Sequence, residues 1–230
     1  MTDINREKRL AAERSLEFVH DGMSLGLGSG STAAIMLELL GRRVREGLCV
    51  RGIPTSDMSR QLAEREGIPI VGFDQVSYLD LTIDGADEVD PDLNVIKGGG
   101  GALLREKIVA SLSRRVVIIV DSHKQVRRLG GFALPVEVVQ FAWQPLAVRL
   151  AELGVQPVLR PGRDGLPLVT DEGNYILDCA FGRIEKPAAL AALLNAVPGV
   201  VEHGLFVDMV HTVIVGRGEG TEVIERSGTC

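Results

Sequence analysis

The sequence has few cysteines and no long apolar run, and both absences limit what the protein can be. Its three cysteines, Cys49, Cys179 and Cys230, are far apart and form no Cys-x-x-Cys pair. We therefore expect reduced thiols in a cytoplasmic protein rather than a disulfide framework. The charged opening residues lack the apolar stretch of a secretory signal, and no apolar run approaches the ~20 residues of a membrane helix. These patterns predict no membrane partner.

Positive charge is also in short supply. The chain has 25 lysines and arginines against 31 acidic residues, which gives a net charge of −6. An acidic surface repels the phosphates of nucleic acids, so we expect no nucleic-acid partner. A local cationic pocket for a small anion remains compatible with this composition.

Strands alternate with helices through the first 130 residues. Continuous apolar runs predict strands at 23–28, 48–54, 68–73, 79–85, 93–96 and 114–121. Amphipathic segments with polar caps predict helices at 5–20, 31–47, 56–67 and 102–113. Ser31 or Thr32 is placed to cap the second of these helices. This alternation predicts the α/β class, with a Rossmann-like, mostly parallel sheet that has helices on both faces.

The pattern changes after Gly130. The expected order is a strand at 132–139, a helix at 143–154, strands at 156–161 and 175–182, a helix at 186–197 and a strand at 199–206. This β-α-β-β-α-β order is the split βαβ signature. We therefore predict a small α+β, ferredoxin-like domain at 131–205, inserted into a Rossmann-like domain at 1–130 plus 206–230. An apolar strand at 212–218 is expected to return to the first domain.

A glycine- and serine-rich loop, GLGSGST at 26–32, lies between a predicted strand and a predicted helix. Glycines allow a sharp turn, and the helix start offers N–H groups and a positive dipole end. With the hydroxyls of Ser29, Ser31 and Thr32, the loop is a candidate phosphate cradle; a plain tight turn is the alternative. The GxGxG spacing does not match a dinucleotide fingerprint, and no Walker lysine follows.

Acidic residues follow the apolar strand at 79–85. Asp84 lies at the carboxyl end of that strand, where α/β sheets bind ligands, and Asp87 follows after Gly85. Their carboxylates could bind Mg²⁺, transfer protons or hydrogen-bond sugar hydroxyls, and a polar turn is the structural alternative. Glu88, Asp90 and Asp92 are expected to belong to such a turn.

The stretch KGGGGALLREK, at 97–107, combines a lysine with four glycines before a predicted helix. Exposed amides beside Lys97 can form an anion or oxyanion site. Glu106 lies in the first turns of the helix, where a glutamate is usually solvated. Lys124 follows another strand at the same sheet rim and could reach a phosphate, or be a surface lysine.

The segments GLGSGSTA, DGADEVD, KGGGGALLREK and DSHKQ, in this order and spacing, resemble ribose-5-phosphate isomerase of type A over essentially the whole chain. The resemblance implies an enzyme that interconverts ribose 5-phosphate and ribulose 5-phosphate through an enediolate, without metal or redox cofactor. It implies Glu106 as the general base, Asp84 as an acid in ring opening, and Asp87 and Lys97 as polar catalytic groups. It also implies a substrate-binding set: Ser29, Gly30, Ser31, Thr32, Asp84, Gly85, Ala86, Asp87, Lys97, Gly98, Gly99, Gly100 and Lys124.

Two alternatives to the isomerase come from other functional classes. A sugar-phosphate sensor without catalysis would need a DNA-binding segment and a basic face, for which this acidic chain has little room. A nicotinamide-dependent dehydrogenase would need the dinucleotide fingerprint that the loop lacks. The resemblance further implies a homodimer or a homotetramer.

Overall fold

The computed structural model describes residues 3–226, which form two compact units. The first unit runs to Ala86 and also contains Arg105–Gln125 and the chain from Met209 onward; the second contains Asp87–Leu104 and Val126–Asp208. Cys230 lies outside the described residues. The division into domains at 1–130 with 206–230 and at 131–205 stays a prediction. The compact units describe how the chain packs, and they do not test whether either part folds independently.

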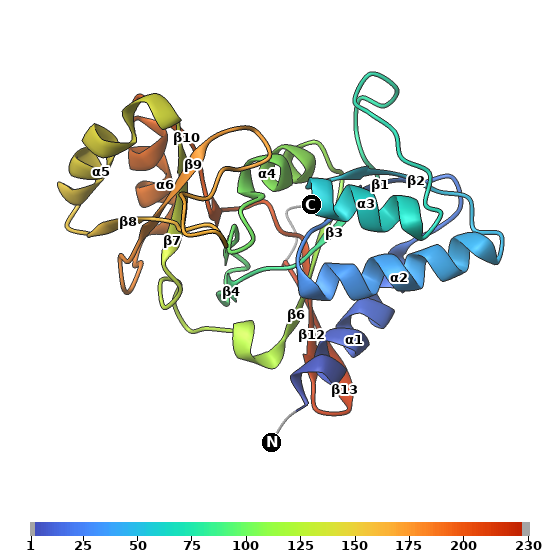
Figure 1. Cartoon of the computed structure of the whole chain (residues 1–230). Coiled ribbons are helices and arrows are strands. Elements are labelled where there is room, and N and C mark those ends of the chain that lie inside the picture. Colours follow the sequence, from blue (N-terminus) through green and yellow to red (C-terminus); the bar gives the residue numbers. More distant parts are fainter. Residues whose placement is uncertain (1–2, 227–230) are drawn as a thin grey trace. The chain divides into compact units, whose positions relative to one another are not determined.

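The first unit is built on a six-stranded sheet in the order β13-β12-β6-β3-β1-β2 (Figure 1). Its neighbouring strands run parallel, apart from the antiparallel pair of β12 and β13. Four consecutive parallel pairings confirm the predicted mostly parallel sheet. The strands are β1 (Ser24–Leu27), β2 (Arg51–Pro54), β3 (Leu81–Asp84), β6 (Val116–Asp121), β12 (Thr212–Arg217) and β13 (Gly220–Glu225).

Helices cover both faces of this sheet. The helices of this region are α1 (Ile4–Ser15), α2 (Ser31–Arg45), α3 (Asp57–Arg65) and α4 (Leu103–Ser111), with 3-10 turns η1 (Leu16–Phe18) and η2 (Ser122–Lys124). The first three helices share one apolar core with β1, β3, β6 and β12, to which β1 contributes Leu25 and Leu27. Val109 of α4 packs instead with Ile53 of β2 in a separate cluster. Because side chains alternate along a strand, Gly26 points to the α4 face, where a Cβ would lie 2.5 Å from Val109.

The second unit contains the predicted split βαβ arrangement. Its four-stranded antiparallel sheet has the order β10-β7-β9-β8. Along the chain its elements are β7 (Leu134–Val138), η3 (Gln140–Ala142), α5 (Trp143–Ala151), β8 (Pro157–Leu159), β9 (Tyr175–Cys179), α6 (Pro187–Asn195) and β10 (Val200–His203). A second, three-stranded sheet joins β4 (Glu88–Val89), β5 (Val95–Ile96) and β11 (Leu205–Phe206) in the order β11-β5-β4.

Two local predictions were wrong, and one strand was missed. The strand expected at 68–73 is reduced to an isolated parallel bridge between Gly52 and Ile70, since Pro69 has no N–H to donate. Neither Ser31 nor Thr32 caps α2: the N-cap is Gly30, at φ +91°, and Ser31 is already helical. The edge strand β13 was not expected, because its exposed side chains form no apolar run.

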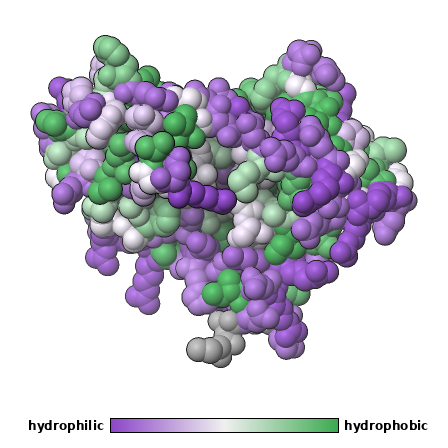
Figure 2. Space-filling model, viewed as in Figure 1, coloured by the Kyte–Doolittle hydropathy of each residue, from purple (hydrophilic) through white to green (hydrophobic). Residues whose placement is uncertain are grey.

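The surface mixes polar and apolar groups. On the face drawn in Figure 2, hydrophobic residues are interspersed with hydrophilic ones. The large apolar side chains of the second unit that are most exposed include Phe141, Val148 and Leu166. No helix in residues 3–226 has the length and apolar character needed to cross a membrane.

Candidate active site

The glycine- and serine-rich loop connects β1 to α2 in the first unit. Gly30 takes the positive φ that glycine tolerates, and no side chain caps the start of α2. The first-turn N–H groups of α2 are therefore not used by a capping side chain. This is the geometry that favours an anion at a helix start.

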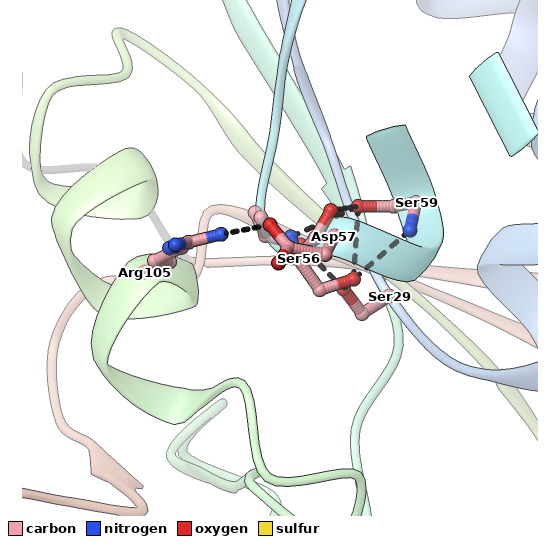
Figure 3. Close-up of polar contacts among 6 residues, drawn as sticks. Ser29, Ser56, Asp57, Ser59 and Arg105 are labelled. Carbon is pink, nitrogen blue, oxygen red and sulfur yellow. Dashed lines mark hydrogen bonds and ion pairs between the residues drawn. The ribbon is translucent and has the colours of Figure 1, made fainter. Parts of the chain in front are cut away.

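The Ser29 side chain is hydrogen-bonded to hydroxyl groups at the start of α3 (Figure 3). Ser29 Oγ lies 2.7 Å from Thr55 Oγ1 and donates to Ser56 Oγ at 2.8 Å. Ser56 and Ser59 form the capping box of α3. The Ser29 side chain is thus fixed by the start of α3.

Lys8 is a residue of this region that the sequence interpretation missed. It comes from α1, and its Nζ donates to Ser31 Oγ at 2.9 Å. The contact brings a cation to the first residue of α2, beside the candidate phosphate loop. A lysine in a charged opening helix has no local pattern that distinguishes it from its neighbours, so only the fold reveals it.

Asp84 ends β3 and is 2% exposed. Its Oδ1 accepts hydrogen bonds from the N–H groups of Ser29 at 3.0 Å and Gly85 at 2.7 Å. A Cβ on Gly28 would lie 2.3 Å from the same oxygen, so that glycine leaves the space the carboxylate occupies. The Asp84 carboxylate is therefore packed against the backbone of the candidate phosphate loop.

Glu106 is buried, with 5% exposure, in the first turns of α4. The solvated surface position that is usual for such a glutamate is not found here. Its neighbour Arg105 forms a 2.7 Å ion pair with Asp57 at the start of α3, as Figure 3 shows. Thr82 lies two residues before Asp84 on β3, so the two side chains point to the same face. Thr82 Oγ1 lies 2.6 Å from Ser113 Oγ, just after α4. Asp84 and α4 therefore lie on the same face of the sheet.

Lys124 lies in η2, directly after β6, and is half-buried. Nearby, Glu7, Asp121 and His123 place potential metal-ligating atoms within 4.8 Å of one another. Glu7 already accepts backbone hydrogen bonds from Ser122 at 3.0 Å and Gly218 at 2.9 Å. Burial acts to raise the pKa of Glu7, but these bonds and His123 outweigh it and lower the pKa. We interpret Glu7 as an ionised link between α1 and the ends of β6 and β12.

In the second unit, Asp87 and Lys97 flank the three-stranded sheet. Asp87 Oδ2 accepts a 2.8 Å hydrogen bond from the N–H of Gly99. Lys97 is 3% exposed, and its Nζ lies 5.7 Å from the centre of the Phe206 ring. Gly98 has φ +102°, and its position leaves room for Leu103, which a Cβ would approach to 2.8 Å. By contrast Gly99 and Gly100 are exposed.

Glu88 and Asp90 have structural hydrogen bonds, whereas Asp92 is exposed. Glu88 is a strand residue rather than a turn residue, and it accepts bonds from the N–H groups of Gly130 and Phe132, both at 2.6 Å. Asp90 accepts from the side chain and the N–H of Asn94, at 3.0 and 2.8 Å.

Known proteins resemble this chain over nearly its whole length. Residues 51–220 match the family profile of ribose 5-phosphate isomerase A (phosphoriboisomerase A). Ribose-5-phosphate isomerase A of Nitrobacter hamburgensis is 53% identical over 225 residues, which are 95% of this chain and 97% of that protein. The corresponding protein of Bradyrhizobium diazoefficiens is 50% identical, with 97% of both chains covered.

Solved structures show the same similarity. A D-ribose-5-phosphate isomerase in complex with phospho-erythronic acid is 40% identical, with a TM-score of 0.95 over 97% of this chain and 100% of that one. Ribose 5 phosphate isomerase A from Neisseria gonorrhoeae is 41% identical, with a TM-score of 0.92 over 99% of this chain and 100% of that one.

Fold and sequence together place the chain in the class of α/β isomerases. A profile match over residues 51–220 and relatives at about half identity identify the family. The chain belongs to the ribose 5-phosphate isomerase A family.

Proposed function

We propose that the protein interconverts ribose 5-phosphate and ribulose 5-phosphate by proton transfer through an enediolate, with Glu106 as the general base. Membership of the family supports the reaction. The single structural observation that carries the assignment of the base is the burial of Glu106. At 5% exposure the Glu106 carboxylate is shielded from water, and proton abstraction from carbon needs a positioned carboxylate.

Glu106 and Asp84 have different roles in this proposal. Glu106 removes the proton from C2 of the aldose and returns it to C1. Asp84 helps to open the sugar ring and moves protons between the hydroxyl oxygens. The bonds from Ser29 and Gly85 fix the Asp84 carboxylate on the α4 face, which gives this second acid a defined direction.

The phosphate is assigned to the loop at 29–32. The uncapped start of α2, the serine and threonine hydroxyls and the contact of Lys8 with Ser31 support this assignment. Lys124 is assigned to the same phosphate from the family resemblance. Phosphate binding at a distance from the reacting carbons supplies energy that fixes their position.

Residues 85–87 and 97–100 are assigned to the sugar. Lys97 stabilises the oxygen that becomes negative in the enediolate, and the carboxylate of Asp87 binds sugar hydroxyls. Gly85, Ala86 and Gly98 to Gly100 contribute backbone groups where larger side chains would obstruct the substrate. The burial of Lys97 and the exposure of Gly99 and Gly100 support these roles.

Comparison of Glu106→Gln with Glu64→Gln tests the base. Glu64 is an exposed glutamate on α3, so the control makes the same chemical change away from the site. With ribose 5-phosphate as substrate and EDTA present, we expect kcat to fall roughly 10²- to 10⁴-fold in Glu106→Gln and to stay unchanged in the control. In D₂O, wild-type turnover should carry solvent deuterium into the product. Retained activity in Glu106→Gln would refute the role of Glu106.

The alternatives give different outcomes in the same assay. A folded wild type that binds the sugar phosphate without turnover would favour the sensor, and activity restored by Mg²⁺ would favour a metal enzyme. A homodimer or homotetramer is proposed from the family resemblance, and light scattering on the purified protein measures it. Cytoplasmic location stays a prediction from the sequence.

A further inference from the structure

An arginine from the second unit supports the glycine loop that the proposed function assigns to the sugar. Arg160 follows β8, and its side chain is 11% exposed. Its Nη1 donates to the carbonyl oxygen of Gly98 at 2.7 Å and to that of Gly99 at 3.1 Å. One guanidinium therefore holds two consecutive peptide carbonyls of the loop.

The guanidinium is itself fixed. Its Nε donates to Asp178 Oδ2 at 2.9 Å, and its Nη2 bonds to Asp178 Oδ1, which makes a bidentate pair. Asp178 lies on β9, opposite Val158 of β8. The Arg160 backbone is also bonded on both sides, to Ile176 O and from Leu168 N, each at 2.9 Å. The Arg160 side chain is therefore held in a fixed position.

Holding the carbonyls sets the direction of the amides. A trans peptide is planar, so its N–H points away from its C=O. The peptides whose carbonyls face Arg160 carry the N–H groups of Gly99 and Gly100. The Gly99 N–H donates to Asp87 at 2.8 Å. Within residues 3–226, no hydrogen bond is formed by the Gly100 N–H, and a Cβ on Gly100 would have no heavy atom within 4 Å.

We propose that Arg160 is a positioning residue for the isomerisation: it fixes the carbonyls of Gly98 and Gly99 so that the Gly100 N–H is aimed at the sugar oxygen that becomes negatively charged. The inference rests on the proposed function. Donors that are already oriented stabilise a developing oxyanion without reorganisation during the reaction. Arg160 also polarises the two peptides, which strengthens their N–H groups as donors.

Arg160→Met tests this role, because methionine keeps an apolar stem and removes the donors. Its matched control is Arg149→Met, on α5, where the arginine is 66% exposed and its nearest acid is 4.0 Å away. We expect kcat to fall about 10- to 100-fold in Arg160→Met, with KM changed less than about 3-fold and the control unchanged. Arg160→Lys should recover only part of kcat, because an ammonium cannot bind Asp178 in the bidentate way and also hold two carbonyls.

Ligand affinity separates positioning from a general structural role. Phospho-erythronic acid carries a carboxylate where the enediolate is charged, whereas erythritol 4-phosphate has a neutral hydroxyl there. Calorimetry should show about 10-fold weaker binding of the acid to Arg160→Met and unchanged binding of the alcohol. Equal loss for both ligands, or wild-type kcat, would overturn the inference.

If Arg160→Met does not fold, Asp178→Asn is the test variant, because it keeps Arg160 but weakens the bidentate ion pair that fixes the guanidinium. A lower kcat with unchanged KM would support the positioning role of Arg160, and wild-type kinetics would refute it. If wild type itself does not convert ribose 5-phosphate, the proposed function fails rather than the positioning by Arg160 alone.

Discussion

Gly28→Ala should displace the Asp84 carboxylate, and the size of the effect follows from three distances. An added Cβ would lie 2.3 Å from Asp84 Oδ1, 2.5 Å from its Cγ and 2.5 Å from its Cα. Carbon atoms in favourable contact are about 3.5–4.0 Å apart, so the two chain segments must separate by about 1 Å. Rotation of the Asp84 side chain cannot relieve the clash, because Cα is a backbone atom.

The backbone has little freedom to move. Strand β3 is paired with β1 on one side and with β6 on the other, and Asp84 is in register with Ile118. Overpacking of this kind costs about 1–3 kcal/mol of unfolding free energy. A misplacement of about 1 Å at a catalytic group costs roughly 10² in rate. We therefore expect Gly28→Ala to lose both stability and kcat, with the larger loss in kcat.

Gly220→Ala is the matched control. It makes the same substitution in the first unit, where a Cβ meets nothing within 4 Å and φ is not positive. Urea unfolding should show the control at or slightly above wild-type stability, and its kcat should be unchanged. A Gly28→Ala protein with wild-type stability would refute the packing argument, and one that is destabilised but fully active would refute the role of Asp84.

Three further predictions use other parts of the molecule. Lys8→Met should raise KM for ribose 5-phosphate about 10-fold and leave kcat nearly unchanged, because a bond to a charged group is worth about 1.5–3 kcal/mol; wild-type KM would remove Lys8 from the phosphate site. Burial raises the pKa of Glu137, so its stabilising effect is largest at low pH and is lost as pH rises from the ordinary glutamate value through the raised one. Urea unfolding should therefore show that the free energy of unfolding falls less between about pH 4.5 and pH 8 in Glu137→Gln than in wild type. Equal falls in the two proteins would contradict a raised pKa of Glu137. Burial raises the pKa of the Cys179 thiol to about 12, whereas Cys49 is exposed. In a Cys230→Ser background, a thiol reagent should label Cys49 in the native protein and Cys179 only after unfolding, and rapid native labelling of Cys179 would refute its burial.

The parts of the fold that the sequence predicted share a strong local signal. Residues 116–121 are an uninterrupted apolar strand ending in an acid, and they form the centre of the sheet as β6. The β-α-β-β-α-β order is likewise marked by short apolar runs that alternate with helices of ordinary length. Where the signal was weak, a strand was missed: β13 has Val223 and Ile224 between charged neighbours, and its pairing with β12 depends on tertiary structure.

The candidate site divides in a similar way. Asp84 could be placed because it ends an apolar strand, and the loop at 26–32 because its glycines have a local conformational purpose. Lys8 and Arg160 could not be placed, because each acts on a loop far away in sequence through a single long side chain. Such contacts depend on how α1 and β8 pack, and neither residue differs in its local context from arginines and lysines at the surface.

The resemblance implied Glu106 as the general base, but the sequence also contained a local signal for its burial, which the surface-like triplet at 105–107 obscured. In α4, residues 103, 106 and 110 are three and four positions apart, so they lie on one face of the helix. Leu103 and Ala110 on that face are 0% and 6% exposed. A glutamate between two buried apolar positions belongs to the buried face, although its neighbours Arg105 and Lys107 make the triplet look like a solvated surface. The spacing of these buried positions therefore predicts a buried Glu106, and the kinetics of Glu106→Gln test whether this buried acid transfers the proton.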